Sequence, residues 1–384
     1  MLIKVFISGV LLFALLACSS LNNVDTPLAS AILHDQAYPG FEQVKVETQT
    51  QVFALDTVLK NYLDQHILPF PTQKQRMQAL AEQLFSPSQV NLLYETQANT
   101  VASDTFRQRT ANCLSMSILA YVMAEYADLQ VTFQDVHIPE FWNVHDDVSF
   151  VNGHINLELS AADLAENGES MHRESMIIDF NDVYASNRFS KTQLDMPTVM
   201  AMFYNNKGAD ALLKKDFTQA YAYFRQSVLV APAYASGWSN LGVLYRLTDH
   251  LEWAERAYEA GLQVDPKNRS IWDNQVVLLE MTGRETEANV IRRRIESQRQ
   301  SNPYYHYYLG QQAYENGDWH QAIRHYKKAR KLNHYAHQFY FGLAKAFYEL
   351  GDIQATRHNL QLAKRYARDR QLTQRYLSKL DVIN

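Results

Sequence analysis

The 384-residue sequence is short of cysteine, of long apolar runs and, in its first half, of basic residues. Two cysteines allow one disulfide at most, which excludes a small scaffold held together by disulfides. Charged residues make up 20% of the chain and hydrophobic residues 47%, a balance that excludes a largely disordered protein. Beyond the first segment, no apolar run is long enough for a membrane-spanning helix. The composition therefore predicts a globular chain, and its length favours two domains.

Charge is divided unevenly along the chain. Residues 1–200 carry 10 Lys and Arg against 23 Asp and Glu, whereas residues 201–384 carry 26 against 18. This asymmetry fits two domains that attract each other or meet different partners, and it fits solvated faces of helical repeats equally well. No single basic stripe indicates a nucleic-acid site, so we expect no nucleic-acid partner.

The N-terminus has the features of a cleavable secretory signal. Lys4 precedes an apolar run over residues 5–16, which is too short to span a bilayer stably. The following stretch, Leu15-Leu16-Ala17-Cys18, resembles the lipobox of bacterial lipoproteins. An ordinary signal peptide with a chance cysteine is the alternative.

The lipoprotein resemblance implies a lipid anchor for the mature protein. Residues 1–18 would be the signal peptide with its lipobox, and Cys18 would carry the lipid. Ser19 after that cysteine implies retention at the periplasmic face of the outer membrane. We expect residues 19–50 to form a flexible polar tether. Cys113 would then have no partner in the chain for a disulfide, so it is either buried and inert or a reactive thiol.

The second half of the chain repeats with a period of 34 residues. The period needs no register shift over five repeats between residues 201 and 370, and small residues alternate with aromatic ones in fixed columns. Small residues let two helices approach closely, and aromatic residues fill the space between neighbouring repeats. The small columns are Gly208, Gly242, Val276, Gly310 and Ala344, and Ala220, Ala254, Ala288, Ala322 and Thr356; the large columns are Tyr204, Trp238, Trp272 and Tyr340, and Phe224, Tyr258 and Tyr326.

This pattern resembles the tetratricopeptide family. Pro232 and Pro266 are placed to end the second helix of a repeat, and Gly283 lies at a turn within one. The third repeat departs from the family because Arg292 stands where an aromatic residue is expected. The resemblance implies an all-α solenoid over residues 201–370 that presents a groove to a protein or peptide ligand. We expect residues 371–384 to form a solvating cap helix.

The first half contains a lone thiol at the start of an apolar helix. Residues 114–124 are almost all apolar or small, and Thr110 or Asn112 can cap the helix. Cys113 therefore falls at a helix N-terminus, where the macrodipole and unpaired N–H groups favour the thiolate. We expect this position to lower the pKa of Cys113, and the same N–H groups to be able to hold an oxyanion.

Downstream, the hydrophobic period changes to two. Residues 131–136 read as a strand, and residues 148–151 and 154–157 read as a hairpin joined by Asn152-Gly153. A further strand over residues 176–179 ends in Asp179. The chain order is then a helix with cysteine, a strand with histidine and a strand with aspartate.

That order resembles the transglutaminase-like superfamily of papain-type thiol enzymes. The resemblance implies an α+β domain over residues 51–200, with Cys113 as nucleophile, His154 as base and Asp179 as the carboxylate that orients the imidazole. Joined to the repeats, the whole chain looks like bacterial lipoproteins that combine such a domain with C-terminal tetratricopeptide repeats. Ala111 stands where members often have glycine.

Several alternatives at this site stay open. Asn112 and Gln108 are candidates for a side-chain oxyanion donor. His137 and His145 are rivals of His154 for the role of base. Asp179 also suits an ordinary turn. The histidines lack the spacing of a zinc site, so we expect no metal, and no cofactor either.

Two classes of function follow. The first is an envelope thiol acyl-transfer enzyme, a peptidase or amidase in which Cys113 attacks an amide and the repeats recruit a protein or peptide substrate. The second is a non-catalytic lipoprotein scaffold that binds envelope protein partners through its repeats. The sequence leaves the oligomeric state open.

Overall fold

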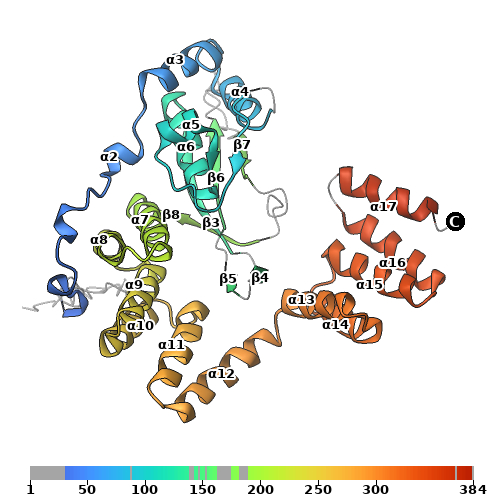
Figure 1. The fold of residues 1–384 in the computed structure, drawn as a ribbon. Coiled ribbons are helices and arrows are strands. Elements are labelled where there is room, and N and C mark those ends of the chain that lie inside the picture. Colours follow the sequence, from blue (N-terminus) through green and yellow to red (C-terminus); the bar gives the residue numbers. More distant parts are fainter. Residues whose placement is uncertain are drawn as a thin grey trace, which may run out of the picture.

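The computed structural model describes residues 31–86, 89–137, 142–145, 148–151, 154–161, 174–180, 189–367 and 370–382. The signal peptide and Cys18 lie outside these residues. Figure 1 shows an N-terminal part built from helices and a sheet, followed by a long row of paired helices. None of the described helices is both long and apolar enough to cross a membrane.

The N-terminal part contains a four-stranded antiparallel sheet with strand order β7-β6-β3-β8. Its strands are β3 (Gln130–Val136), β6 (His154–Ala161), β7 (Glu174–Ile178) and β8 (Lys191–Leu194). The helices of this part are α2 (Gln49–Val52), α3 (Thr57–His66), α4 (Gln73–Phe85), α5 (Ala102–Gln108) and α6 (Cys113–Tyr126). A short parallel pair, β1 (Leu93–Tyr94) and β2 (Thr110–Ala111), leads into α6.

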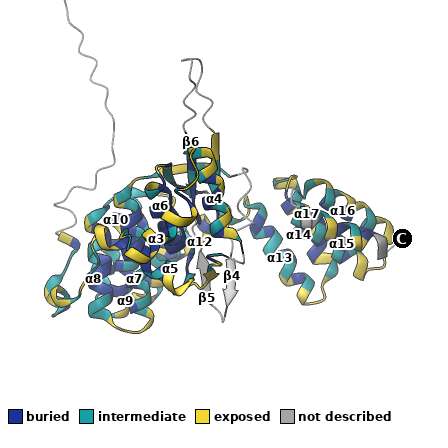
Figure 2. Cartoon of the chain, turned by 90° about the horizontal axis from the view of Figure 1, so that it is seen from above, coloured by how far each residue is buried: buried dark blue, intermediate teal, exposed yellow. Residues whose placement is uncertain are grey.

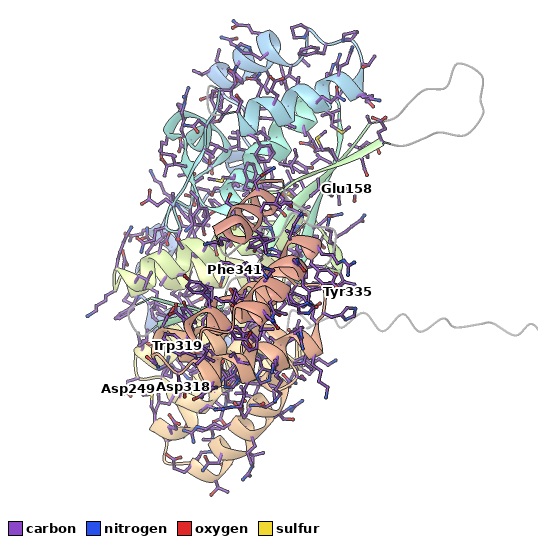
Figure 3. All side chains as sticks on the ribbon, turned by 90° about the vertical axis from the view of Figure 1, so that its right-hand side faces the viewer. Glu158, Asp249, Asp318, Trp319, Tyr335 and Phe341 are labelled. Carbon is purple, nitrogen blue, oxygen red and sulfur yellow. The ribbon has the colours of Figure 1, made fainter. Side chains whose placement is uncertain are left out.

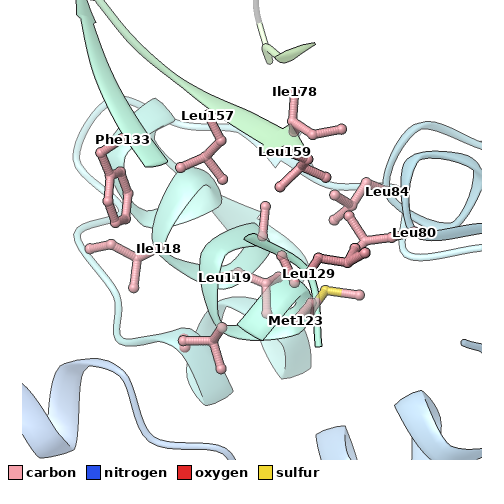
Figure 4. Packing of buried hydrophobic residues seen from close by; sticks show 14 of the residues in the cluster. Leu80, Leu84, Ile118, Leu119, Met123, Leu129, Phe133, Leu157, Leu159 and Ile178 are labelled. Atoms are coloured by element: carbon pink, nitrogen blue, oxygen red, sulfur yellow. The ribbon is translucent and has the colours of Figure 1, made fainter. Parts of the chain in front are cut away.

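Helix α6 is the centre of the N-terminal core. It is apolar on nearly all sides, as expected of a helix that is enclosed rather than half-exposed. In Figure 4, Leu119 and Met123 of α6 lie among Leu157 of β6 and Leu80 and Leu84 of α4, and all five are buried. The apolar run after Cys113 therefore packs α6 against both the sheet and α4.

The predicted hairpin between residues 148–151 and 154–157 is wrong. Strand β5 (Val148–Val151) pairs with β4 (Trp142–His145), and β6 pairs with β3 and β7. Strand β3 pairs with β6 from His154 onward and β7 pairs with its other edge from Leu157 onward, while β5 pairs with β4 instead. Asn152 and Gly153, the local turn signal, lie outside the described residues.

The second half forms five helix pairs that keep the 34-residue period. The first helices of repeats two to five begin at residues 235, 269, 303 and 337. The pairs are α7 (Met196–Leu213) with α8 (Phe217–Val230), α9 (Ala235–Leu247) with α10 (Leu251–Val264), α11 (Arg269–Met281) with α12 (Glu285–Arg299), α13 (Pro303–Glu315) with α14 (Trp319–Leu332), and α15 (His337–Glu349) with α16 (Ile353–Tyr366). Helix α17 (Arg370–Val382) follows where a cap helix was predicted.

The small and aromatic columns meet as the sequence predicts. A Cβ added at Gly208 would come 2.6 Å from the ring of Phe224, and one at Gly310 would come 2.6 Å from the ring of Tyr326. A Cβ at Gly342 of the next repeat would lie 2.8 Å from the same Tyr326 ring. Tyr326 therefore fills the space within its repeat and towards the next one.

The row of repeats opens after the third pair. Figures 1 and 2 both show α13 to α17 standing apart from α7 to α12. At the position of the missing aromatic residue, Arg292 is exposed and ion-paired with Glu280 and, at 3.7 Å, with Glu285. A solvated guanidinium cannot fill the space that Tyr326 fills one repeat later, so the buried clusters on the two sides of this point are separate.

The described part of the predicted tether, residues 31–50, is packed against the first repeats. Ile32 and Tyr38 are 4% and 3% exposed within the core of those repeats. Tyr38 stacks on Tyr221, which also donates a 2.6 Å hydrogen bond to Asp35. The prediction of a flexible segment is wrong here because scattered apolar and aromatic side chains find partners on α8 and α9.

The predicted boundary at residue 200 falls inside one helix. Helix α7 begins at Met196, with Asp195 accepting the hydrogen bond of Thr198 N–H as its N-cap. Val199 and Phe203 of α7 are buried in the N-terminal core, while Ala211 at its other end belongs to the core of the repeats. Helix α7 is thus shared by both parts.

Candidate functional site

The three predicted catalytic residues come from α6, β6 and the end of β7. The period of two along β6 places His154 and Asn156 on one face of the sheet, and Asp179 directly follows β7. The register aligns Leu157 with Ile178, which brings the end of β7 beside the start of β6. His154, Asn156 and Asp179 are 4%, 1% and 5% exposed.

His154 and Asp179 are in direct contact. His154 Nε2 lies 2.8 Å from Oδ1 and 2.9 Å from Oδ2 of Asp179, so this N–H donates to the carboxylate. Asn156 Nδ2 donates a 3.0 Å hydrogen bond to the same carboxylate. Asp179 thereby fixes the orientation of the imidazole, with Nδ1 on the side that the carboxylate does not contact. The role of Asn156 was not predicted, although its spacing of two from His154 is a usable signal.

Cys113 is the first residue of α6, and the capping residue is Asn112. Asn112 Oδ1 accepts a 2.9 Å hydrogen bond from Ser115 N–H. This confirms one of the two predicted caps. The cap satisfies one N–H of the first turn and leaves the N–H groups of Cys113 and Leu114 directed at the sulfur.

The expected lowering of the thiol pKa is not found. Burial raises the pKa of Cys113 above its ordinary value, and the hydrogen bonds from the N–H groups of Leu114 and Cys113 only partly oppose this effect. The negative charge of Asp179 raises the pKa further, which places this carboxylate within electrostatic range of the thiol. The side chain is partly accessible and is not in a disulfide. The structure thus joins His154 to Asp179 and places this carboxylate in electrostatic range of a thiol whose raised pKa favours its protonated form.

Neither side-chain oxyanion candidate occupies the expected role. Both ends of the Asn112 amide are engaged, because Oδ1 caps α6 and Nδ2 donates to Asn99 Oδ1. Gln108 is exposed at the end of α5. The backbone N–H groups of Cys113 and Leu114 are better placed, since they already point at the sulfur.

The other histidine that can be placed with its side chain, His137, is committed elsewhere. Its Nδ1 lies 3.1 Å from Ser190 Oγ and its Nε2 3.0 Å from Thr192 Oγ1, at an exposed position. His145 ends β4, where only the backbone is described. Among the residues with described side chains, His154 is therefore the histidine that Asp179 orients.

Ala111 lies in β2 and is fully buried. It pairs with Tyr94 in β1 and does not have a positive φ. Glycine is thus not required here by backbone conformation. The Cβ of Ala111 is accommodated in the packing before α6.

The described residues contain no cluster of three or more His, Cys, Asp or Glu side chains that could hold a metal ion.

A second candidate site lies in the last repeat. An open pocket of about 460 Å³ is lined by residues of α13, α15, α16 and α17, among them Phe341, which Figure 3 labels. Lys345 Nζ lies 4.4 Å from the ring centre of Tyr314 and 5.8 Å from that of Phe341. Lys379 Nζ lies 5.5 Å from the ring centre of Phe341. Two ammonium groups therefore converge over aromatic side chains.

The charge around this pocket is predominantly positive. The helices that line it, α13 and α15 to α17, carry seven lysines and arginines against three acidic residues, Glu315, Glu349 and Asp381. Burial lowers the pKa of Lys345, Glu315 opposes this effect, and the charge of Lys379 lowers the pKa further. A cation in this setting is stabilised by a bound anion.

Comparison with known proteins agrees with the repeat pattern. A model of the tetratricopeptide repeat family matches residues 307–357. No curated protein gives a significant match to the sequence.

Solved structures similar to this chain include a Pseudomonas aeruginosa pilF structure, with 17% identity and a TM-score of 0.27 over 49% of this chain and 89% of that one. YrrB, described as a tetratricopeptide repeat protein with an unusual peptide-binding site, has 12% identity and a TM-score of 0.25 over 46% and 92% of the two chains. MamA has 17% identity and a TM-score of 0.24 over 44% and 91%. Scores this low carry no argument about function. The family match and the helix pairs nevertheless establish that the C-terminal region is a solenoid of tetratricopeptide repeats.

Proposed function

We propose that this protein is a scaffold that binds an acidic polypeptide segment on its tetratricopeptide repeats, in the pocket of the last repeat. The observation that carries this proposal is the convergence of Lys345 and Lys379 over Phe341 in a pocket with an apolar floor. A carboxylate can pair with the two ammonium groups while an adjacent apolar side chain contacts the rings. The excess of basic residues on α14 to α17 attracts such a segment over a longer range.

Binding of a labelled acidic peptide tests this proposal. The probe is a fluorescein-labelled peptide of Asp, Glu and Phe, compared with a peptide of equal length that has Asn and Gln in place of the acids. We expect the variant with Lys345→Glu and Lys379→Glu to bind the acidic peptide at least about tenfold more weakly, because two charge-assisted contacts become repulsive. The matched control, Lys327→Glu with Lys331→Glu on α14, makes the same charge change outside the pocket. Equal losses in the two variants would show a general charge effect instead of a site.

A second candidate function is thiol acyl transfer at Cys113. It is favoured by the contact of His154 with Asp179 beside the N-terminus of α6, the arrangement implied by the resemblance to transglutaminase-like enzymes. Because the thiol is protonated, His154 Nδ1 would accept its proton as Sγ attacks an amide carbonyl. The N–H groups of Cys113 and Leu114 would stabilise the oxyanion, and His154 would return the proton to the departing amine. Water then attacks the thioester, His154 takes its proton and gives it to the sulfur, and a carboxylic acid leaves.

Trapping the acyl intermediate tests the second candidate. After incubation with peptides from a bacterial envelope digest, intact-mass measurement should show an acyl adduct on the protein. The adduct should be absent in Cys113→Ala and much weaker in His154→Gln, because the protonated thiol needs His154 to accept its proton before it attacks. An adduct that forms equally well in Cys113→Ala would remove Cys113 from the chemistry.

We further propose that the protein is anchored to the bacterial envelope through a lipid on Cys18, at the periplasmic face of the outer membrane. The support for this placement is the lipobox-like stretch that ends in Cys18, followed by Ser19.

A further inference from the structure

A chain of side-chain hydrogen bonds connects the first repeat to the start of α6. Asp210, near the end of α7, accepts a 2.5 Å hydrogen bond from Asn99 Nδ2. Asn99 Oδ1 accepts from Asn112 Nδ2, and Asn112 Oδ1 accepts from Ser115 N–H. Three residues from two parts of the molecule thus lead to the cap of the helix that begins with Cys113.

The carboxylate of Asp210 sets the direction of the whole chain. An ionised carboxylate only accepts hydrogen bonds, so Asn99 must present its NH₂ group to Asp210 and its oxygen to Asn112. Asn112 must in turn present its NH₂ group to Asn99, which leaves its oxygen for Ser115 N–H. Asn99 and Asn112 are 8% and 5% exposed, so a reversed amide would leave buried groups without partners.

Backbone contacts hold Asn99 against α6. Asn112 N–H donates to Ala98 O at 3.1 Å, and Thr100 N–H donates to Ser115 Oγ at 2.9 Å. The residues on both sides of Asn99 are therefore tied to the first turn of α6. The contact with Asp210 extends this set of bonds to α7, the first helix of the repeats.

We propose that Asp210 is a positioning residue for the thiol site, which it acts on through Asn99 and Asn112. By fixing the Asn112 cap, it holds the first turn of α6 so that the N–H groups of Cys113 and Leu114 face the sulfur. The catalytic consequence rests on the second proposed function, whereas the hydrogen-bond chain does not.

Amide hydrogen exchange at Ser115 tests the chain directly. In Asp210→Ala we expect the Ser115 amide to exchange about fivefold faster, the factor that corresponds to an ordinary cap hydrogen bond. In Asp210→Asn the rate should stay within about twofold of the parent, because an amide oxygen can still accept from Asn99. The matched control is Asp216→Ala, which removes the cap of α8 in the same repeat and should leave Ser115 unchanged. If Asp210→Ala does not fold, Asp210→Ser, whose hydroxyl is too short to reach Asn99, should show the same acceleration.

Alkylation of Cys113 by iodoacetamide over a range of pH gives the second readout. We expect the profile of Asp210→Ala to move to higher pH than that of the parent, and Asp210→Asn to restore it. A Ser115 rate equal to that of the parent in a folded Asp210→Ala would overturn the inference, whatever the thiol does. Suppose instead that Ser115 exchanges faster in Asp210→Ala, as expected, but that the parent protein forms no acyl adduct. This outcome would reject only the thiol enzyme.

Discussion

His154 donates its Nε2–H to both oxygens of Asp179 in a buried setting, at 2.8 and 2.9 Å. Loss of the carboxylate leaves the histidine without that acceptor and removes the partner of Asn156 Nδ2 as well. We therefore expect Asp179→Ala to lower the free energy of unfolding in urea by about 2–4 kcal/mol. Asp104→Ala, which breaks an exposed pair with Arg107, is the control and should cost less than about 1 kcal/mol. Equal losses of unfolding free energy in the two variants would show that the contact between His154 and Asp179 does not stabilise the fold.

The ionisation of Cys113 gives a prediction about pH. Because its pKa is raised in the folded protein, the thiolate fraction and the alkylation rate should reach half of their maximum above pH 9. The folded state also holds this proton more tightly than the unfolded chain, so this residue's contribution to stability is present below pH 9 and is lost as the pH rises through the folded pKa. Cys113→Ser provides the blank for alkylation. An inflection below pH 8 would show that the helix N-terminus and His154 outweigh burial.

The contact of Gly310 with Tyr326 gives a prediction about the repeats. A methyl group at Gly310 would lie 2.6 Å from the ring, so we expect Gly310→Ala to destabilise the repeats by about 1–3 kcal/mol in thermal or urea unfolding. In the background of Tyr326→Leu the same substitution should cost much less, because the ring is gone. A double-mutant cycle measures this difference. Additive effects would mean that contact with the Tyr326 ring is not what makes Gly310→Ala destabilising.

The packing of residues 31–46 on the repeats predicts a loss of stability on truncation. Deletion of residues 19–46 removes buried Ile32 and Tyr38 and the ion pair of Asp35 with Arg225. Burial of two large side chains corresponds to about 3–6 kcal/mol, so thermal unfolding should shift down by several degrees. Deletion of residues 19–30 alone is the control and should leave the transition in place. Identical transitions for the two truncations would mean that the segment contributes nothing to the fold.

Lipid attachment is predicted for Cys18. In a Gram-negative host, the full chain should incorporate labelled palmitate and fractionate with membranes, and Cys18→Ala should lose both properties. Cys113→Ala should keep them, because its thiol is not the proposed attachment point. Label retained in Cys18→Ala would reject the lipobox interpretation.

The repeats could be predicted in detail because each signal in them is local. The 34-residue columns, the helix ends at Pro232 and Pro266 and the turn at Gly283 each depend on one or two helices, and the structure confirms them. The Asn112 cap likewise depends on the four consecutive residues 112–115 of one turn. Hydrophobic periodicity and helix capping depend only on residues that are close together in the sequence.

What could not be predicted depends on residues distant in sequence. The turn signal at Asn152 could not show that β6 pairs with β3 and β7, and that β5 pairs with β4. The stacking of Tyr38 on Tyr221 could not be predicted from the composition of the segment around residue 38. The helix N-terminus favoured a more acidic thiol, but the opposing desolvation of Cys113 comes from the surrounding tertiary structure.

Helix α7 has a consequence for how the protein can be divided. Since Phe203 lies in one core and Ala211 in the other, a cut at residue 200 would leave one fragment with an open cavity and the other with an exposed apolar helix end. The N-terminal half and the first repeats should therefore fold as one cooperative unit. The region from α13 onward, whose buried clusters are its own, can fold and unfold as a separate unit. The natural point at which to express two independent fragments is thus near residue 300, about one hundred residues beyond the junction that the sequence suggests.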